Sequence, residues 1–238
     1  MQRQRIDKIL SSQNIASRSE TKNMIKAGRI KADGITVKRA DEKFDPETTV
    51  ISVDGQTICF KEYLYIMMNK PAGVLSASND RYAKTVIDLL PNELKRKGLF
   101  PAGRLDKDTE GLMLITDDGE LAHKMLSPKN HVFKLYYAET DKILTDEDVK
   151  AFQSGIRYGD VICRSADMKI IGEKNAFVEI CEGKFHQIKK MFASLGANVL
   201  YLKRIRIGEV SLDENLRPGE FRELTEQEKT DILKRTKE

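Results

Sequence analysis

The chain has 238 residues, enough for two compact domains, and its 40% apolar and 33% charged residues are typical of a globular rather than a disordered protein. No run of about 18 apolar residues occurs, which argues against a membrane-spanning helix, and the first residues lack the apolar stretch of a signal peptide. The three cysteines are odd in number and far apart, so we expect neither a disulfide framework nor a zinc site, and a reducing cytoplasm is the expected compartment.

The net charge of +4 is unevenly distributed along the chain. Residues 1–43 contain eleven basic and five acidic side chains, a net charge of +6, whereas the remaining 30 basic and 32 acidic residues give −2. This asymmetry indicates an N-terminal segment that meets a polyanion, although a solvated charged face would have the same composition.

Two short helices are predicted in the N-terminal segment. The spacing of Ile6, Ile9 and Leu10 is that of one face of an amphipathic helix. The sequence Ser-Arg-Ser-Glu at 17–20 has the form of a capping box, and the helix that it begins should end at Gly28.

The second of these helices carries a row of cations. Arg18, Lys22 and Lys26 recur every fourth residue, and Arg29 continues the row, so the four side chains should lie along one side of the helix. Such a row is either an anion-binding surface or a solvated helix face.

Small strands should follow the two helices. Apolar residues flank Asp33-Gly34, which predicts a tight hairpin, and another strand-like stretch at 50–53 ends at Asp54-Gly55. The segments RIDKIL, ASRSE, IKAGRIKADG and VISVDG, in this order over residues 3–55, resemble the S4 RNA-binding domain. The resemblance implies that Arg18, Lys22, Lys26 and Arg29 contact RNA phosphates, which confer grip and orientation rather than sequence choice.

The chain then continues into a larger domain after a short junction near residues 56–61, so we expect domains at 1–59 and 60–238. The predicted strands of the larger domain lie at 63–68, 112–116, 132–139, 167–171 and 175–181, and the predicted helical segments at 85–90, 93–97, 117–126, 146–154 and 185–195. Strands and helices do not alternate regularly, which favours an α+β fold with a mixed, mainly antiparallel sheet.

The segment from Gly103 to Gly111, Gly-Arg-Leu-Asp-Lys-Asp-Thr-Glu-Gly, gathers charged and hydroxyl side chains directly before an apolar strand. A loop presented by a rigid scaffold in this way is a common place for reactive groups. Taken alone, however, Asp and Thr in such a loop more often form turns and caps.

The order of four segments changes this balance. NKPAG, GRLDKDTEGLMLIT, KLYYAE and EGKFHQIKKMFASLG resemble the pseudouridine synthases, in particular the branch that acts on ribosomal RNA and carries an N-terminal S4 domain. The resemblance extends over essentially the whole chain, including its ending IRIGEVSLDENLRPGEFRELT.

The resemblance implies a role for five residues. Asp106 stands at the catalytic aspartate of the family, and Arg104 at an arginine that helps to extrude the target uridine. Tyr136 stands at the tyrosine that stacks on the uracil ring, Ile188 at an apolar residue of the base pocket, and Lys189 at a basic residue that pairs with the aspartate. Many synthases have arginine at the last position, and lysine keeps the charge without the planar two-pronged geometry.

Isomerising uridine to pseudouridine exchanges no electrons and hydrolyses nothing, so we expect neither a cofactor nor a metal. A carboxylate can assist by attacking the sugar, by attacking the base or by abstracting a sugar proton, and the residues alone do not choose among these routes. The carboxylate must be ionised, which a neighbouring cation such as Lys189 would favour.

Other residues carry weaker expectations. His186 should line the pocket or contact RNA rather than act as an acid or base, Asp108 and Thr109 should shape the loop, and Lys70 and Pro71 should support the site from a neighbouring turn. Lys203, Arg204 and Arg206 form a late basic cluster that is either an RNA contact or a solvated strand edge.

The expected partner is ribosomal RNA, free or in a partly assembled small subunit, and the expected state is a monomer without membrane association. Two alternatives stay open: the same chemistry on large-subunit RNA, and a non-catalytic RNA-binding factor in ribosome assembly. Retention of Asp106, Tyr136 and Lys189 together argues against the second, because a binding protein has no use for that trio.

Overall fold

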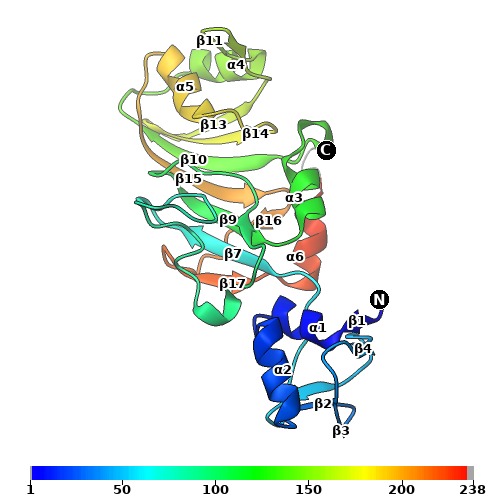
Figure 1. Cartoon of the computed structure of the whole chain (residues 1–238). Coiled ribbons are helices and arrows are strands. Elements are labelled where there is room, and N and C mark those ends of the chain that lie inside the picture. Colours follow the sequence, from blue (N-terminus) through cyan, green and yellow to red (C-terminus); the bar gives the residue numbers. More distant parts are fainter. Residues whose placement is uncertain (1, 235–238) are drawn as a thin grey trace. The chain divides into compact units, whose positions relative to one another are not determined.

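The computed structural model of the chain describes residues 2–234, which form two compact units (Figure 1). The first unit comprises the residues up to Tyr63 together with Leu90–Leu99, and the second comprises Leu64–Leu89 and the chain from Phe100 onward. None of the helices within residues 2–234 is long and apolar enough to cross a membrane.

The first unit contains two helices and small strands, as the sequence predicts. Helix α1 spans Ile6–Ser12 and α2 spans Arg18–Lys26; strands β3 (Ile35–Thr36), β2 (Ile30–Ala32), β5 (Ile51–Val53) and β6 (Gln56–Thr57) form a sheet in that order, and β1 (Gln4–Arg5) pairs with β4 (Lys43–Phe44). Apolar side chains of both helices, including the fully buried Ile6, Ile9 and Leu10, pack with β2 and β5 in one core.

Local chemistry accounts for these elements. The Ser17 hydroxyl accepts the backbone N–H of Glu20 at 3.2 Å, and the Glu20 carboxylate accepts the N–H of Ser17 at 2.7 Å, which confirms the predicted capping box. Asp33 and Gly34 both have positive φ, as a two-residue turn between β2 and β3 requires.

The residues at 90–99 belong to this unit although they follow Leu89 of the second unit. They contain one 3₁₀ turn, Asn92–Leu94, and the buried Arg96, whose guanidinium donates to the carbonyls of Lys61 and Glu62 at 2.9 and 3.2 Å. The helical segments predicted at 85–90 and 93–97 are therefore wrong, except for that single turn. At 85–90 the Asp88 carboxylate accepts the backbone N–H and the hydroxyl of Thr85, and Thr85 pairs with Leu75, which holds the backbone in turns.

The second unit is built on one mixed sheet. Its strands run in the order β13 (Asp167–Gly172), β14 (Asn175–Ile180), β10 (Lys134–Thr140), β15 (Val199–Ile207), β9 (Glu110–Thr116), β7 (Tyr65–Lys70) and β17 (Phe221–Glu223), with β16 (Val210–Ser211) beside β15 and β8 (Phe100–Pro101) beside β9. Neighbouring strands are antiparallel except β15 and β9, which are parallel. The predicted α+β class with a mixed, mainly antiparallel sheet is confirmed.

Helices cover this sheet in two groups (Figure 1). Helix α3 (Gly119–Leu126) and Ile232, directly after α6 (Glu226–Asp231), share an apolar core with β7, β9 and β16. Helix α4 (Asp146–Ser154) contacts β13, and α5 (Gln187–Ser194) contacts β15 and β11 (Arg157–Tyr158), which forms a small hairpin with β12 (Val161–Ile162). A 3₁₀ turn, Pro128–Asn130, follows α3. Strands β7 and β9 are buried along nearly their whole length, so the loop between β8 and β9 starts from a rigid part of the sheet.

Candidate functional site

The loop that carries Asp106 is held by a buried lysine of the neighbouring strand. Lys70, at the end of β7, is fully buried, and its ammonium donates to the carbonyls of Pro71, Lys107 and Thr109 at 3.0, 3.3 and 2.8 Å. Two of these carbonyls belong to the loop between β8 and β9. One cation therefore fixes the backbone on the C-terminal side of Asp106.

A serine holds the other side of the same loop. The Ser76 hydroxyl donates to the carbonyl of Leu105 at 2.8 Å and accepts the N–H of Leu105 at 3.0 Å, and Gly73 N–H donates to Lys107 O at 2.7 Å. The segment after Lys70 thus supports the loop from beside it, and Asp106 is presented with its side chain about one quarter exposed.

Burial leaves Lys70 an unusually weakly basic ammonium. The pKa of Lys70 is lowered to about 8, mainly because burial removes water from the ammonium. The nearby carboxylates of Asp108, Glu110 and Asp106 raise the pKa and offset part of this effect.

A cavity of about 60 Å³ lies beside Asp106 in the second unit. It brings together all five residues that the sequence predicts for a catalytic pocket: Arg104, Asp106, Tyr136, Ile188 and Lys189. They come from three separate parts of the chain, namely the β8–β9 loop, strand β10 and helix α5.

The walls and the lip of this cavity differ in character. Tyr136 and Ile188 are buried, with 8% and 4% of their surface exposed, so an aromatic ring and an aliphatic side chain form an apolar wall of the cavity. Arg104 is exposed, and within residues 2–234 its guanidinium has no hydrogen-bond or ion-pair partner. It is therefore available to a ligand at the rim.

Two cationic or potentially cationic groups face Asp106. Lys189 Nζ lies 3.7 Å from one Asp106 carboxylate oxygen, and His186 Nε2 lies 3.4 Å from the other. Lys189 also makes a shorter ion pair, at 2.5 Å, with Asp108, and this hydrogen bond is the first cause of the lowered pKa of Asp108. The lysine expected beside Asp106 is thus shared between two carboxylates.

His186 lines the cavity, as expected, but its closeness to Asp106 was not expected. The residue has a left-handed backbone, with φ of 54°, directly before α5, and this geometry turns its ring toward the loop 80 residues earlier in the chain. No local pattern in the sequence shows this proximity, although the segment containing His186 was already matched to the site.

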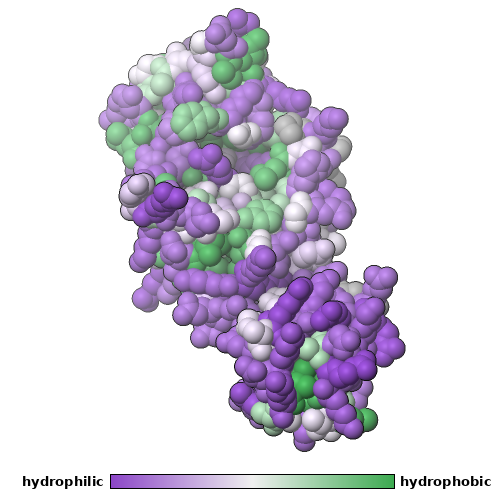
Figure 2. All heavy atoms as spheres, viewed as in Figure 1, coloured by the Kyte–Doolittle hydropathy of each residue, from purple (hydrophilic) through white to green (hydrophobic). Residues whose placement is uncertain are grey.

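On the first unit, α2 presents cations as expected. Arg18, Lys22 and Lys26 are exposed and line a shallow groove that Lys38 completes, and none of the three has an ion-pair partner among the residues that the structure describes. The side of the first unit visible in Figure 2 is predominantly hydrophilic. Arg29 differs from its three neighbours, because its guanidinium makes a two-pronged ion pair with Asp54.

The late basic cluster is mostly engaged inside the sheet. Arg204 is buried on β15 and donates to the carbonyl of Leu112 at 2.8 Å, and Arg206 pairs with Glu179 at 2.6 Å. Arg204 is therefore neither an RNA contact nor part of a solvated strand edge, because it is buried on β15, which lies between β10 and β9.

Comparison with known proteins agrees with this geometry. The family model described as RNA pseudouridylate synthase matches residues 64–194, which contain the loop, the aromatic wall and the lysine of the cavity, and the S4 domain model matches residues 4–50. The chain belongs to the RNA pseudouridylate synthase family. It is an isomerase that converts uridine in RNA to pseudouridine, and it carries an N-terminal S4 domain.

Its relatives match over nearly their whole length. An RNA pseudouridine synthase of Bacillus subtilis, YtzG, is 45% identical over 94% of this chain and 96% of its own, and the ribosomal small subunit pseudouridine synthase A of Vibrio cholerae is 38% identical over 97% of this chain and 100% of its own. A crystal structure of a pseudouridylate synthase superimposes with a TM-score of 0.68 at 34% identity, covering 96% of this chain and 99% of that one. Both domains of the synthase are therefore shared with these proteins.

Proposed function

We propose that this synthase isomerises one uridine of small-subunit ribosomal RNA, with Asp106 as the nucleophile acting on a base that has left its stack. The relatives from Vibrio cholerae and Salmonella typhimurium, at 38% and 37% identity over nearly full length, bear the name ribosomal small subunit pseudouridine synthase A, which supports this choice of RNA. The observation that carries the chemistry is the position of the Asp106 carboxylate at a small cavity walled by Tyr136 and Ile188.

The reaction needs a carboxylate at this place. The N1–C1′ bond breaks, the base rotates, and C5 joins C1′; the proton lost from C5 is balanced by one gained at N1. Asp106 can add to the sugar or to the base, or remove a sugar proton, and each route needs the ionised form. Lys189 at 3.7 Å and His186 at 3.4 Å favour that form when they carry a positive charge.

The remaining cavity residues would hold the flipped base. Extruding a nucleotide costs a few kcal/mol, and stacking on an aromatic ring such as Tyr136 returns about 1–3 kcal/mol. Ile188 would complete the apolar slot. Arg104, exposed at the rim, would enter the space that the uridine leaves in the RNA.

The S4 domain, which we assign to residues 1–59, would grip the RNA backbone through Arg18, Lys22 and Lys26, and residues 60–238 would form the catalytic domain. Arg29 would act mainly on the protein itself through Asp54. We further propose that the synthase works as a monomer in the cytoplasm, on free ribosomal RNA or a partly assembled small subunit, because one chain supplies every residue of the cavity.

The direct test is pseudouridine mapping after incubation of the wild-type synthase and the Asp106→Asn variant with unmodified small-subunit RNA, large-subunit RNA and partly assembled subunits. We expect one new pseudouridine in small-subunit RNA with the wild type and none with the variant, while a filter-binding assay shows unchanged RNA affinity. Modification of large-subunit RNA alone would reject the substrate, turnover by Asp106→Asn would reject the nucleophile, and binding without modification of any RNA would favour an assembly factor. Mapping ribosomal RNA from cells with and without the gene provides the matching test in vivo.

A further inference from the structure

An aromatic side chain stands exposed beside the cavity without a role in the proposed reaction. Phe185 has 67% of its surface exposed, in the loop that joins β14 to α5. Its ring stacks on that of His186, with ring centroids 3.8 Å apart and planes inclined by 21°. A single exposed apolar side chain is common on protein surfaces, so the place of this ring, stacked on a histidine of the cavity lining, is what makes it informative.

The loop is held firmly by a buried hydrogen-bond network. Gln187 Nε2 donates to the Glu182 carboxylate at 2.9 Å, and the Lys184 backbone N–H donates to Gln187 Oε1 at 2.9 Å; both Gln187 and Glu182 are buried. Lys184 Nζ in addition donates to the carbonyl of Ile162 at 2.6 Å. The backbone on both sides of Phe185 is therefore fixed, and the ring is presented rather than left on a loose tip.

His186 connects this ring to the proposed nucleophile. Its Nε2 lies 3.4 Å from Asp106, while its ring covers Phe185. A planar group on the other face of Phe185 would consequently be separated from Asp106 by two stacked rings, those of Phe185 and His186. A second nucleotide of the strand that holds the target uridine could reach this position.

Charge around the ring fits a nucleic acid rather than an apolar ligand. Lys190 Nζ lies 4.9 Å from the centroid of Phe185 and 5.4 Å from that of Tyr158, and it forms no ion pair with the residues in the described part of the chain. A base that stacks on Phe185 would have to displace this ammonium from over the ring, and the displaced ammonium could then meet the phosphate of the same nucleotide. An aromatic ring beside a cation is the combination used by proteins that bind single-stranded nucleic acid.

We propose that Phe185, backed by His186, is the stacking platform for the nucleobase adjacent to the target uridine. The inference rests on the proposed function, because it places a second nucleotide of the same RNA strand at the same site. The adjacent base leaves the stack together with the target, and its contact with Phe185 offsets part of that cost without contacting the reacting atoms.

The first experiment uses the absence of tryptophan from the chain. Phe185→Trp introduces a single tryptophan, whose fluorescence should be quenched when a single-stranded RNA containing the target uridine stacks on it. The matched control is Ile143→Trp, because Ile143 is also exposed, at 57%, but lies beside Lys142, whose ammonium donates to Leu195 at the far end of α5. Its fluorescence should change little.

The second experiment separates stacking from catalysis. Phe185→Ala should raise KM about 10-fold, within the 1–3 kcal/mol of one base–aromatic stack, with kcat within about 2-fold, and Phe185→Tyr should restore KM. Replacing the nucleotide 5′ or 3′ of the target by an abasic residue should raise the wild-type KM by the same factor on one side only. The Phe185→Ala variant should be insensitive to that replacement.

An unchanged KM for Phe185→Ala, or no quenching of Phe185→Trp while the wild type modifies the same RNA, would overturn the platform and leave the proposed function intact. If the wild type modifies no ribosomal RNA, the proposed function fails separately, and quenching of Phe185→Trp by a single-stranded oligouridine decides the platform alone. Quenching would retain it as a base-binding surface, and an unchanged emission would reject it.

Discussion

Asp106 and Asp108 are two residues apart on one loop, and both face Lys189, yet their surroundings differ. Asp106 is about 24% exposed at the cavity, whereas Asp108 is 73% exposed and takes the shorter ion pair. Hydrogen bonding to Lys189 lowers the pKa of Asp108, so that this carboxylate stays ionised and holds the ammonium near the loop. Asp108 thereby shares the ammonium of Lys189 with Asp106, and without Asp108 the ammonium would still lie beside Asp106.

This difference leads to a prediction for three variants. Lys189→Met should lower kcat about 100-fold, in the range found when one preorganised electrostatic contact is removed, because Asp106 loses its nearest lysine. Lys189→Arg should keep most of the activity, since the charge remains. Asp108→Asn, the matched control on the same loop, should reduce kcat by about 3-fold or less. Single-turnover pseudouridine formation measures all three.

Equal losses for Asp108→Asn and Lys189→Met would show that the exposed carboxylate, and not the cation, sets the reactivity of Asp106. A stable fold of each variant, checked by thermal unfolding, is needed for this comparison.

Between strands β9 and β15, Gly111 leaves no room for a side chain, because a Cβ there would meet the backbone of Arg204. A Cβ atom built on Gly111 would lie 2.1 Å from the carbonyl oxygen of Arg204, and the residue has a φ of +100°. Only glycine allows this backbone and this approach. The second glycine of the loop motif therefore belongs to the parallel pairing of β9 with β15.

We predict that Gly111→Ala lowers the free energy of unfolding by at least about 2 kcal/mol, because both overpacking and a disfavoured φ contribute. Gly119→Ala in α3 is the control: a Cβ there meets nothing within 4 Å, and φ is not positive. Its effect should stay within about 1 kcal/mol. Urea denaturation measures both, and equal stabilities would contradict the close approach.

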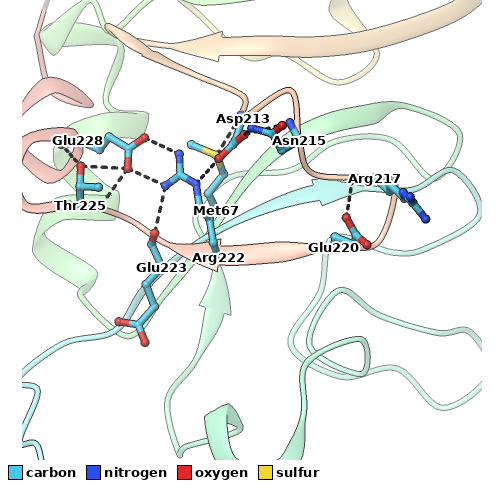
Figure 3. A network of polar contacts seen from close by, with 9 residues as sticks. All are labelled: Met67, Asp213, Asn215, Arg217, Glu220, Arg222, Glu223, Thr225 and Glu228. Carbon is cyan, nitrogen blue, oxygen red and sulfur yellow. Dashed lines mark hydrogen bonds and ion pairs between the residues drawn. The ribbon is translucent and has the colours of Figure 1, made fainter.

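An arginine joins the edge strand β17 to two other elements (Figure 3). Arg222 pairs with Asp213, in the turn after β16, at 2.6 Å, and with Glu228, in the first turn of α6, at 2.7 Å. Glu228 also accepts the N–H of Thr225 at 2.8 Å and completes the capping box of α6. One guanidinium thus fastens the edge of the sheet to the last helix.

The pKa of Glu228 is lowered from an ordinary value of 4.5 to about 2, and the hydrogen bonds from Arg222 are the largest cause. Because the folded chain binds this proton more weakly than the unfolded chain, the stabilisation is complete above pH 4.5 and is lost as the pH falls toward 2. Arg222→Met should remove about 1–3 kcal/mol at pH 7 and flatten the stability profile between pH 4.5 and 2. Arg217→Met, which removes an exposed cation whose side chain points away from this network, should do neither. Chemical denaturation at a series of pH values tests the difference.

Elements with a complete local signal could be predicted from the sequence. The capping box at Ser17 and the two-residue turn at Asp33-Gly34 each contain all the groups that they need within four residues. At 85–97, by contrast, two short helical segments were expected, but Thr85 pairs with Leu75 and residues 90–99 pack with the first unit. Contacts made outside a segment decide its conformation there, and its own residues do not show them.

The same distinction applies to the candidate site. The five cavity residues could be named because they lie in ordered motifs, but the motifs do not show that Lys189 is shared with Asp108. Support from Lys70 was expected, but the motifs do not show that it acts through two carbonyls of the loop, or that Arg204 is buried, since both depend on strand order in the sheet. Which strands become neighbours is a long-range property.

Positive charge is concentrated in the N-terminal part of the chain, which suits the two domains to different roles on one RNA substrate. The first 43 residues carry a net charge of +6, and three cations of α2 have no partner among residues 2–234, whereas the rest of the chain is slightly negative. Affinity for RNA should thus come largely from the S4 domain through release of counterions, and selectivity from the cavity of the second unit.

We predict that replacing Arg18, Lys22 and Lys26 together by glutamine weakens RNA binding and reduces the slope of log K against log salt by about 2. The control loses the same charge at three exposed lysines of the second unit, Lys150, Lys169 and Lys174. It should leave the slope within about 0.5. Binding titrations between 50 and 300 mM salt, on the order of the usual range, measure both; an unchanged slope in the α2 variant would reject the S4 domain as the main phosphate contact.

Because residues 90–99 belong to the first unit, the chain cannot be divided into its two units by a single cut, and the first unit cannot be exchanged as one continuous segment. The polypeptide crosses between the units three times. Within the first unit, Arg96 donates hydrogen bonds to the backbone carbonyls of Lys61 and Glu62. A protease nick near residue 60 would divide the first unit between two fragments, because residues 90–99 would stay on the C-terminal one. A gene shortened to begin there would encode these ten residues without the rest of their unit. Transplanting this RNA-binding module onto another enzyme would accordingly require two grafts, the N-terminal extension and the distant loop that belongs with it.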